Sequence, residues 1–313
     1  MKKSIVPFLC LIICLTFSPA VSATPVRIGV LPIVDALPFY VAQEKGLFKN
    51  LPRPVSLITF RSAVERDAAF QTHKLDAYLG DLISAALLRS RGFPARAVSV
   101  ILGQKPGEGL FAILSSPASS IRTIEDLRNK QVAISSNTII EYVLDGLLKA
   151  NGIPESDIKK QEIKSIPIRF QMLMNNKIDA AVLPDPLASL AQFKGAHWIA
   201  DDGKTNLSQT VLIWNDLFLR HNRNFLKLFY RAYDRAVAII NRNHDAVRSL
   251  LVRKCRLPRP IASSFKFQDF PPASPPSRVM ALSVLTWLRH KRLLKKDIRV
   301  RGFIAPIDFF QHR

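Results

Sequence analysis

HKLDA at residues 73–77 and NKIDA at residues 176–180 are two versions of one pattern, in which a helix ends and a buried strand begins. The likeness extends backwards along the chain, because Arg66 and Arg169 each lie ten residues before the aspartate of their stretch. Supersecondary units that recur along a chain indicate repeated architecture. The two stretches therefore predict two similar lobes.

Strand-like and helix-like patterns alternate around both stretches. This alternation predicts an α/β fold with a mainly parallel sheet and helices on its faces. The pattern restarts after a small-residue stretch at 115–120, which we interpret as a loop or linker. The predicted strands are 26–31, 55–60, 76–79, 97–102 and 131–134, and the predicted helices between them are 38–44, 62–72, 81–91 and 138–151.

The last third of the chain turns helical. Amphipathic patterns predict helices at 222–241 and 244–254, and a proline-rich connector at 270–276 leads to a last predicted helix that Ser277 caps. Apolar residues at helical spacing in the first of these segments indicate packing contacts and not ligand contacts. They are Leu226, Phe229, Tyr233, Val237 and Ile240.

The first 23 residues have the pattern of a secretory signal peptide. Two lysines precede a mostly apolar run at 5–17, and small residues end at Ala23, where we expect cleavage. The run is shorter than the roughly 20 residues that span a bilayer as a helix. We therefore expect a soluble, periplasmic protein. Lipid anchoring at Cys14 is disfavoured, because bulky residues precede it where a lipoprotein signal has small ones.

Positive charge gathers in the C-terminal third. Without 1–23 the chain has 43 Lys and Arg against 24 Asp and Glu, and residues 215–313 hold 21 and 6 of these. Such a field attracts an acidic partner surface or anionic lipid headgroups, and a solvated basic face without a partner is the alternative. We expect no nucleic-acid partner for an exported chain. The mature chain keeps one cysteine, Cys255, so no internal disulfide can form, and we expect a monomer.

Signatures of catalysis are sparse. The six histidines form no His-Glu-x-x-His pair, and the sequence has no Gly-x-Ser-x-Gly elbow and no phosphate-binding P-loop. One cysteine and scattered histidines are also a poor set of metal ligands. We therefore expect no enzyme activity, no cofactor and no metal.

Three stretches carry a resemblance to a known family. They are residues 35–48 (DALPFYVAQEKGLF), 124–133 (IEDLRNKQVA) and 178–186 (IDAAVLPDP). In this order and spacing, behind a signal peptide, they resemble the substrate-binding proteins of nitrate/taurine/alkanesulfonate-type ABC importers. That family also includes receptors for thiamine-pyrimidine precursors. The likeness covers nearly the whole mature chain.

The resemblance implies the type II periplasmic-binding fold, in which two α/β lobes close over a ligand in the cleft between them. Lobe 1 would be discontinuous, with residues 24–110 and 212–313, and lobe 2 would span 111–211. The chain would cross near 109–114 and return near 206–212. The implied function is that of an extracytoplasmic solute receptor that delivers a small molecule to an ABC importer permease. Two alternatives stay open: a sensing module that feeds a signalling receptor, and a thiamine-pyrimidine-synthase-like enzyme.

Ligands of open α/β sheets bind outside the carboxyl ends of the strands, where loops and helix starts meet. That rule selects a candidate site without reference to the family. Helix capping is the competing role for its hydroxyl groups and for Asp81 and Asp185, whereas Asp35 has no obvious capping duty. The candidates in lobe 1 are Asp35, Leu37, Pro38, Phe60, Arg61, Ser62, Gly80 and Asp81, and those in lobe 2 are Ser135, Ser136, Asn137, Thr138, Asp185 and Pro186.

Charge among these candidates favours one class of ligand. Three carboxylates outnumber one arginine, Arg61, so a nitrate or sulfonate would be repelled unless the arginine and the helix starts prevailed. A neutral or cationic heterocycle would use the carboxylates as hydrogen-bond acceptors and would stack on aromatic rings. From the sequence we therefore prefer a heterocycle, such as a thiamine-type pyrimidine. The rings available for stacking are Phe39, Tyr40 and Phe60.

Overall fold

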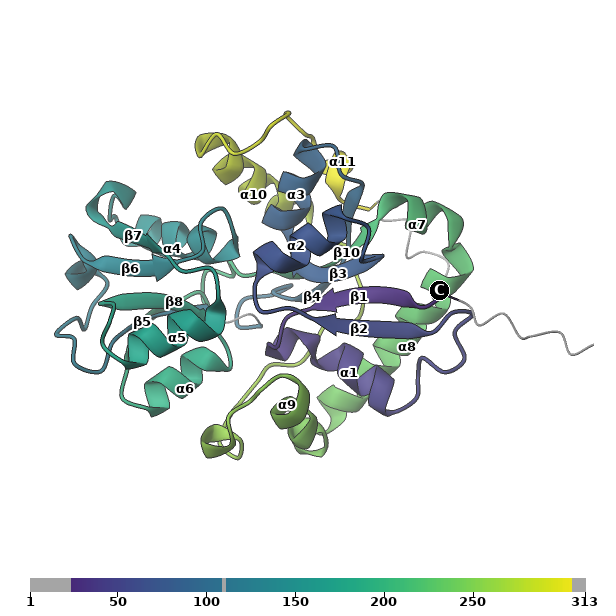
Figure 1. The fold of residues 1–313 in the computed structure, drawn as a ribbon, viewed down its shortest axis with the longest axis horizontal. Helices are drawn as coiled ribbons and strands as arrows, with labels where there is room; N and C mark the ends of the chain where they lie inside the picture. Colours follow the sequence, from purple (N-terminus) through teal and green to yellow (C-terminus); the bar gives the residue numbers. More distant parts are fainter. Residues whose placement is uncertain (1–23, 109–110, 306–313) are drawn as a thin grey trace, which may run out of the picture.

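The computed structural model describes residues 24–108 and 111–305, whose strands form two separate five-stranded sheets (Figure 1). Sheet A has the order β2-β1-β3-β10-β4, and sheet B has the order β7-β6-β8-β5-β9. The strands of sheet A are β1 (Val26–Val30), β2 (Val55–Thr59), β3 (Ala77–Asp81), β4 (Ala95–Leu102) and β10 (Thr210–Asn215). Those of sheet B are β5 (Phe111–Ser115), β6 (Gln131–Ile134), β7 (Lys159–Glu162), β8 (Ala180–Pro184) and β9 (His197–Asp201).

The two sheets have the same topology. In sheet A, β1 pairs in parallel with β2 and β3, whereas β10 pairs antiparallel with β3 and β4. In sheet B, β6 pairs in parallel with β7 and β8, and β5 pairs antiparallel with β8 and β9. In each sheet the antiparallel strand, β10 in sheet A and β5 in sheet B, is the first strand after the chain arrives from the other sheet. The expected two-lobed α/β fold is confirmed.

Helices cover both faces of each sheet, and the helix starts follow capping signals in the sequence. Ser62, Asp81, Thr138 and Ser277 each accept a hydrogen bond from a backbone N–H in the first turn of the helix that follows. The helices are α1 (Leu37–Glu44), α2 (Ala63–Gln71), α3 (Leu82–Ser90), α4 (Ile139–Ala150), α5 (Ile166–Met174), α6 (Leu187–Phe193), α7 (Asp216–His221), α8 (Arg223–Arg242), α9 (Arg248–Lys254), α10 (Arg278–His290) and α11 (Val300–Phe303). Short 3₁₀ turns lie at Val34–Ala36, Glu125–Leu127, Glu155–Asp157, Asp245–Val247 and Arg259–Ile261.

The C-terminal region belongs mainly to lobe 1. α8 packs on α1 over one face of sheet A, and α10 and α11 pack on α3 over the other (Figure 1). The apolar residues of α8 singled out in the sequence are all buried, as expected of packing contacts. α11 corrects the prediction that the helix after Ser277 is the last, because its four residues are too few to give a periodic pattern.

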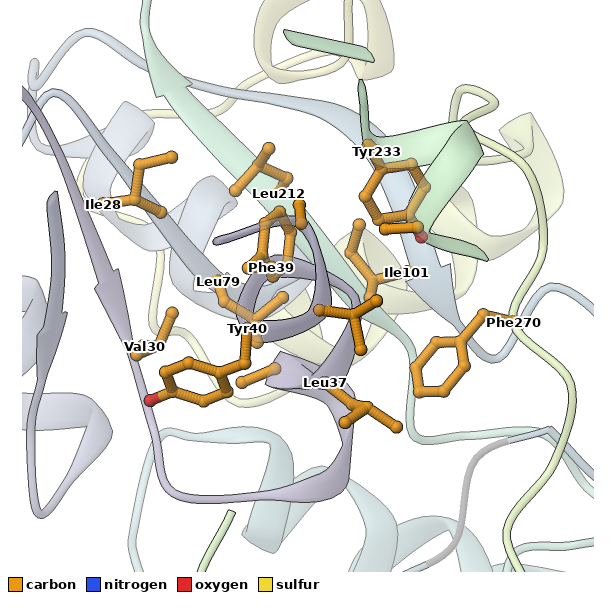
Figure 2. Packing of buried hydrophobic residues seen from close by; sticks show 14 of the residues in the cluster. Ile28, Val30, Leu37, Phe39, Tyr40, Leu79, Ile101, Leu212, Tyr233 and Phe270 are labelled. Atoms are coloured by element: carbon orange, nitrogen blue, oxygen red, sulfur yellow. The ribbon is translucent and has the colours of Figure 1, made fainter. Parts of the chain in front are cut away.

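The core between sheet A and α1 absorbs residues that the sequence suggested for the cleft. Figure 2 shows Leu37, Phe39 and Tyr40 from α1 pointing among buried side chains of β1, β3, β10 and α8. The Phe39 ring lies 5.6 Å from the ring of Tyr233, and the Tyr40 hydroxyl is 3.2 Å from Thr59 Oγ1. The Phe39 and Tyr40 rings therefore stabilise lobe 1 and leave no face for a ligand.

The chain passes from sheet A to sheet B and back again. The first passage follows β4, and its described part is 103–108; the second lies between β9 and β10 and spans 202–209. The ranges expected for the crossings, 109–114 and 206–212, include the first residues of β5 and β10. Those residues already pair with neighbouring strands of their sheets. The lobe limits themselves stay a prediction.

The two crossing segments are bonded to each other. Gly107 N donates to Gly203 O at 2.7 Å, and Asn206 Nδ2 donates to Gly103 O at 2.9 Å. Gly103 has a φ of +85°, and a Cβ there would lie 2.6 Å from the carbonyl oxygen of Ser208, so only glycine permits this approach. Paired crossings of this kind form a defined hinge and not a loose linker.

A cluster of charges also joins the lobes at the end of α10. Lys291 Nζ lies 2.7 Å from Glu155 Oε2, 3.0 Å from Glu141 Oε1 and 3.1 Å from Asp145 Oδ2, all in lobe 2. Lys160 of β7 contacts the same three carboxylates at 2.5 to 3.1 Å. One turn earlier, the indole of Trp287 donates to Asp145 Oδ2 at 2.9 Å. A helix that packs on lobe 1 is thus fastened to lobe 2.

The expected signal peptide, its cleavage after Ala23 and the thiol of Cys14 lie outside the described residues. In the part that is described, no helix is both long and apolar enough to cross a membrane. Cys255 is buried in the core of lobe 1 as a free thiol.

Candidate functional site: the cleft between the lobes

Two adjacent cavities lie between the lobes. The first has a volume of about 50 Å³, and the second has a volume of about 160 Å³. Both are lined by Ile33 from lobe 1 and by Ile166 and Pro184 from lobe 2, so they are parts of one cleft.

Half of the candidate residues line this cleft. The first cavity is bordered by Gly80, Asp81, Ser135 and Thr138, and the second by Arg61, Asp185 and Pro186. Asp35 lies behind the cavity wall. Its carboxylate accepts a hydrogen bond from the hydroxyl of Thr210, and Thr210 lines the first cavity. The strand ends chosen by that rule thus border the cleft, and a ligand role for these residues stays a prediction.

The remaining candidates lie elsewhere or have other partners. Leu37 and Pro38 are buried in α1, and Phe60 packs half-buried against the core of lobe 1. Ser62 caps α2, as the competing interpretation predicted. Ser136 is bonded to the carboxylate of Glu162, and Asn137 N donates to Glu141 Oε2 at 2.8 Å.

Three helix starts converge on the first cavity. Ala63 opens α2 from lobe 1, and Ile139 and Ile166 open α4 and α5 from lobe 2; all three residues line the cavity. The first turn of a helix presents free N–H groups and the positive end of the helix dipole. Their convergence makes the cavity suited to a negatively charged group.

Arg169 is the strongest feature of the cavity wall. Its side chain is 0% exposed and comes from α5. Nε donates to Val182 O at 2.8 Å and Nη1 donates to Ile163 O at 2.7 Å, whereas Nη2 has no acceptor among the described residues. Burial lowers the pKa of Arg169 to about 10, against a small opposing effect of Glu162. The guanidinium remains charged at neutral pH and lacks an ion-pair partner within the described chain.

Arg66 lines the same cavity from lobe 1 but is neutralised there. Its Nη2 lies 2.8 Å from Asp67 Oδ1, and its guanidinium lies over the ring of Tyr78. Burial lowers the pKa of Arg66, but the carboxylates of Asp67 and Asp81 more than offset this and raise it overall. Arg66 is therefore a structural cation.

Two of the cleft carboxylates have raised pKa values. Burial raises the pKa of Asp81 to about 6 although Arg66 and the N–H of Ser84 oppose it. Burial likewise raises the pKa of Asp185 to about 6, against hydrogen bonds from Ser189. Asp81 caps α3 by accepting from Ser84 N, and Asp185, which lies just before α6, accepts from Ser189 N. Their lone pairs are partly used inside the protein, which weakens the case for them as ligand acceptors.

Several lining residues were missed in the sequence. Beyond the two arginines they include Lys164, Gln209 and Thr210, and Gln209 Oε1 is buried without a partner in the described chain. A signal for the arginines was present, because Arg66 and Arg169 keep the same spacing before the repeated aspartates. The return crossing carries Gln209, and no local pattern marks such a position.

The sheets, hinge and cleft define the class: the chain has the two-lobed periplasmic-binding fold. The family model described as NMT1/THI5 like matches residues 34–246, and the chain belongs to this family. Over 195 residues it is 25% identical to a protein of Escherichia coli strain K12 that is named as an aliphatic sulfonates-binding protein. That match spans 60% of this chain and 60% of the relative, so the chain covers less than two thirds of that protein's length.

Solved structures agree on the fold. The alkanesulfonate-binding protein SsuA from Xanthomonas axonopodis pv. citri, bound to MOPS, has a TM-score of 0.77 at 20% identity and covers 91% of this chain and 99% of its own. The desulfurization enzyme DSZB has a TM-score of 0.67 at 17% identity and covers 92% of this chain and 98% of its own. Because an enzyme shares the fold, the fold by itself does not decide between binding and catalysis.

Proposed function

We propose that this protein is an extracytoplasmic receptor that binds a small organic anion between its lobes and delivers it to the permease of an ABC importer. Membership of the family and the named functions of the sulfonate-binding relatives support the receptor role. A signal-peptide pattern at 1–23 supports export.

The observation that carries the choice of an anion is Arg169. A buried cation without a counter-ion is costly unless something pairs with it. Nη2 is the one nitrogen of this side chain without an acceptor among the described residues, and the side chain lines the first cavity. Together with three helix starts it offers charge-assisted hydrogen bonds to an oxyanion, the strong class of hydrogen bond.

The two cavities differ in size and lining, which supports a ligand with a charged end and an apolar end. The first cavity, of about 50 Å³, is the smaller of the two and is the one that the three helix starts and Arg169 border. The second cavity, of about 160 Å³, has an apolar wall that includes Phe170 and Leu187. We therefore infer an anionic head in the first cavity and a short organic tail in the second.

This geometry reverses the ligand preference drawn from the sequence. The heterocycle hypothesis needed free carboxylates and aromatic faces, but Phe39 and Tyr40 pack in the core of lobe 1. Asp35, Asp81 and Asp185 each accept hydrogen bonds from within the protein. A thiamine-type pyrimidine therefore has less support than a sulfonate or another oxyanion.

Such a receptor works because ligand binding shifts the population from open to closed conformations. A ligand that contacts Thr210 of sheet A and Arg169 of α5 together stabilises the closed arrangement, because an open one with separated walls would not offer both contacts. Import would then depend on recognition of the closed form by the permease. The paired crossing segments 103–108 and 202–209 would serve as the hinge of this motion.

Isothermal titration of the mature chain tests the proposal. We expect binding of ethanesulfonate or taurine and little heat with a thiamine-type pyrimidine. Binding of the pyrimidine alone would refute the anion and leave the receptor role intact. Uptake of the bound anion into vesicles that contain the permease and ATPase distinguishes an importer subunit from a sensing module, and turnover of the anion to a new product would indicate an enzyme.

A further inference from the structure

Most of the positive charge of the C-terminal third lies away from the cleft, because Arg256 is the one basic residue of 215–313 among the described residues that line it. Part of this charge borders a separate groove of about 940 Å³. The residues that line the groove come mainly from α10, α11 and the connector that precedes α10, and Figure 1 shows these helices beside α3. The described residues that line this groove are apolar or arginine, apart from Ser277, and include neither a lysine nor a carboxylate. Such a composition calls for an explanation other than general solubility.

Three of the five arginines in the groove are available to a partner. Arg96 pairs with Asp216 at 2.7 Å, and Arg289 pairs with Asp297 at 2.9 Å. No ion pair is found within the described chain for the other three, which are exposed. They are Arg278, Arg299 and Arg301.

The floor of the groove is apolar. Leu285 and Ile304 are buried at its base, and Leu282 is 41% exposed at its side. Val279, which follows Arg278 in the first turn of α10, is 77% exposed. Cations therefore stand next to accessible apolar surface on one face of lobe 1.

We propose that this groove binds an anionic phospholipid, with the phosphate on the unpaired arginines and the start of an acyl chain on the apolar floor. Guanidinium groups match phosphate oxygens in a bidentate manner. Stable binding at a membrane surface takes two signals, such as a basic patch together with inserted apolar groups. The groove supplies both within one set of residues.

A phospholipid fits these observations better than an acidic protein segment or a small anion. A free anion would use the arginines and leave the apolar floor in water. An acidic segment would leave Val279 without a role, whereas a membrane interface accommodates such a side chain. The net excess of 15 basic residues in 215–313, from 21 basic and 6 acidic, adds attraction to an anionic bilayer at longer range.

Co-sedimentation of the mature chain with vesicles tests the proposal. We expect binding to phosphatidylcholine vesicles that contain phosphatidylglycerol, weakened by salt, and no binding to phosphatidylcholine alone. The triple variant Arg278→Gln, Arg299→Gln, Arg301→Gln should bind about a hundredfold more weakly, at about fivefold for each arginine. A matched control changes three exposed arginines of α8 by the same charge: Arg231→Gln, Arg235→Gln and Arg242→Gln. It should lose no more than about fivefold.

A second pair of substitutions tests the accessible apolar surface, which is Leu282 in the groove lining and the exposed Val279 beside the groove. Val279→Ser with Leu282→Ser leaves the charge unchanged, and we expect a further severalfold loss of vesicle binding. Equal losses in both triple variants, or no binding to phosphatidylglycerol vesicles, would overturn the proposal. So would an unchanged affinity of the serine variant. Titration of all variants with the cleft ligand should give the parental affinity, which separates this proposal from the one about the cleft.

Discussion

Arg66 and Arg169 occupy equivalent places in the two lobes and differ in what surrounds them. Each donates a hydrogen bond to a strand carbonyl thirteen residues further on, Leu79 O in β3 and Val182 O in β8. Each is buried and lines the same cavity. Arg66 has carboxylates beside it, whereas Arg169 has a nitrogen without an acceptor in the described chain.

The difference lies in two positions. Asp67 and Asp81 follow Arg66 at the spacings at which Phe170 and Pro184 follow Arg169. Both lobes thus keep the arginine and its bond to the sheet, but lobe 1 alone keeps the counter-ions. A cation that the fold itself does not neutralise is a candidate for binding, and one that it does neutralise is a candidate for stability.

Replacement of Arg66 should have the largest effect. Arg66→Met leaves the buried Asp81 and the half-buried Asp67 without their cation, so we expect the free energy of unfolding to fall by about 3–5 kcal/mol. Urea denaturation measures this. A loss below that of Arg169→Met would contradict the assignment of Arg66 as the structural member of the pair.

Replacement of Arg169 should act on the ligand. Arg169→Met removes a charged hydrogen bond worth about 1.5–3 kcal/mol, so we expect anion affinity to fall about ten- to a hundredfold. Titration calorimetry on the folded variant measures this loss. Arg61→Met, at an exposed arginine of the second cavity, is the control and should lose less. Unchanged affinity in Arg169→Met would remove Arg169 from the site.

The missing counter-ion can be supplied. Phe170→Asp places a carboxylate in lobe 2 at the position that Asp67 has in lobe 1, and we expect anion affinity to fall about tenfold because Arg169 gains an internal partner. Phe170→Leu keeps the apolar wall and should bind nearly as the parent does. If both variants lose affinity equally, packing and not charge explains the effect.

Acidity should change binding by a few fold. The pKa of Asp185 is about 6 when folded and 3.8 ordinarily, so folding favours its protonated form. Its contribution to stability therefore falls as the pH rises from about 4 to about 6. Anion affinity should fall as the pH rises through about 6, because Asp185 of the folded protein gains negative charge there. Titrations from about pH 5 to 7 on the parent and on Asp185→Asn check this. If Asp185→Asn keeps the full pH dependence of anion affinity, another group causes that dependence, and Asp81 is the next candidate.

The sequence predicted the lobes well because their signals are local and repeated. β6 lies at Gln131–Ile134 as expected, and α8 begins and ends within one residue of its prediction. β7 (Lys159–Glu162) was missed, because an edge strand of four polar residues needs no apolar pattern.

The candidate site could be predicted only in part. Rules for strand ends located Gly80, Ser135 and Thr138, since topology fixes where strands end. Arg169 escaped those rules because it lies within a helix, and charged side chains are rarely buried unless paired. Phe39 and Tyr40 were misplaced as ligand contacts because nearly every side chain of α1 faces the core.

The fastening of α10 to lobe 2 has a consequence for how the molecule matures. Lys291 and Trp287 are made after both sheets are complete in the chain, yet they join the second lobe to the first. Each lobe has its own core and the crossings are already paired, but this additional fastening awaits the final tenth of the polypeptide. In a chain that emerges from its amino end, the two lobes would therefore be able to form first, and the contacts of Lys291 and Trp287 would be the last to join them.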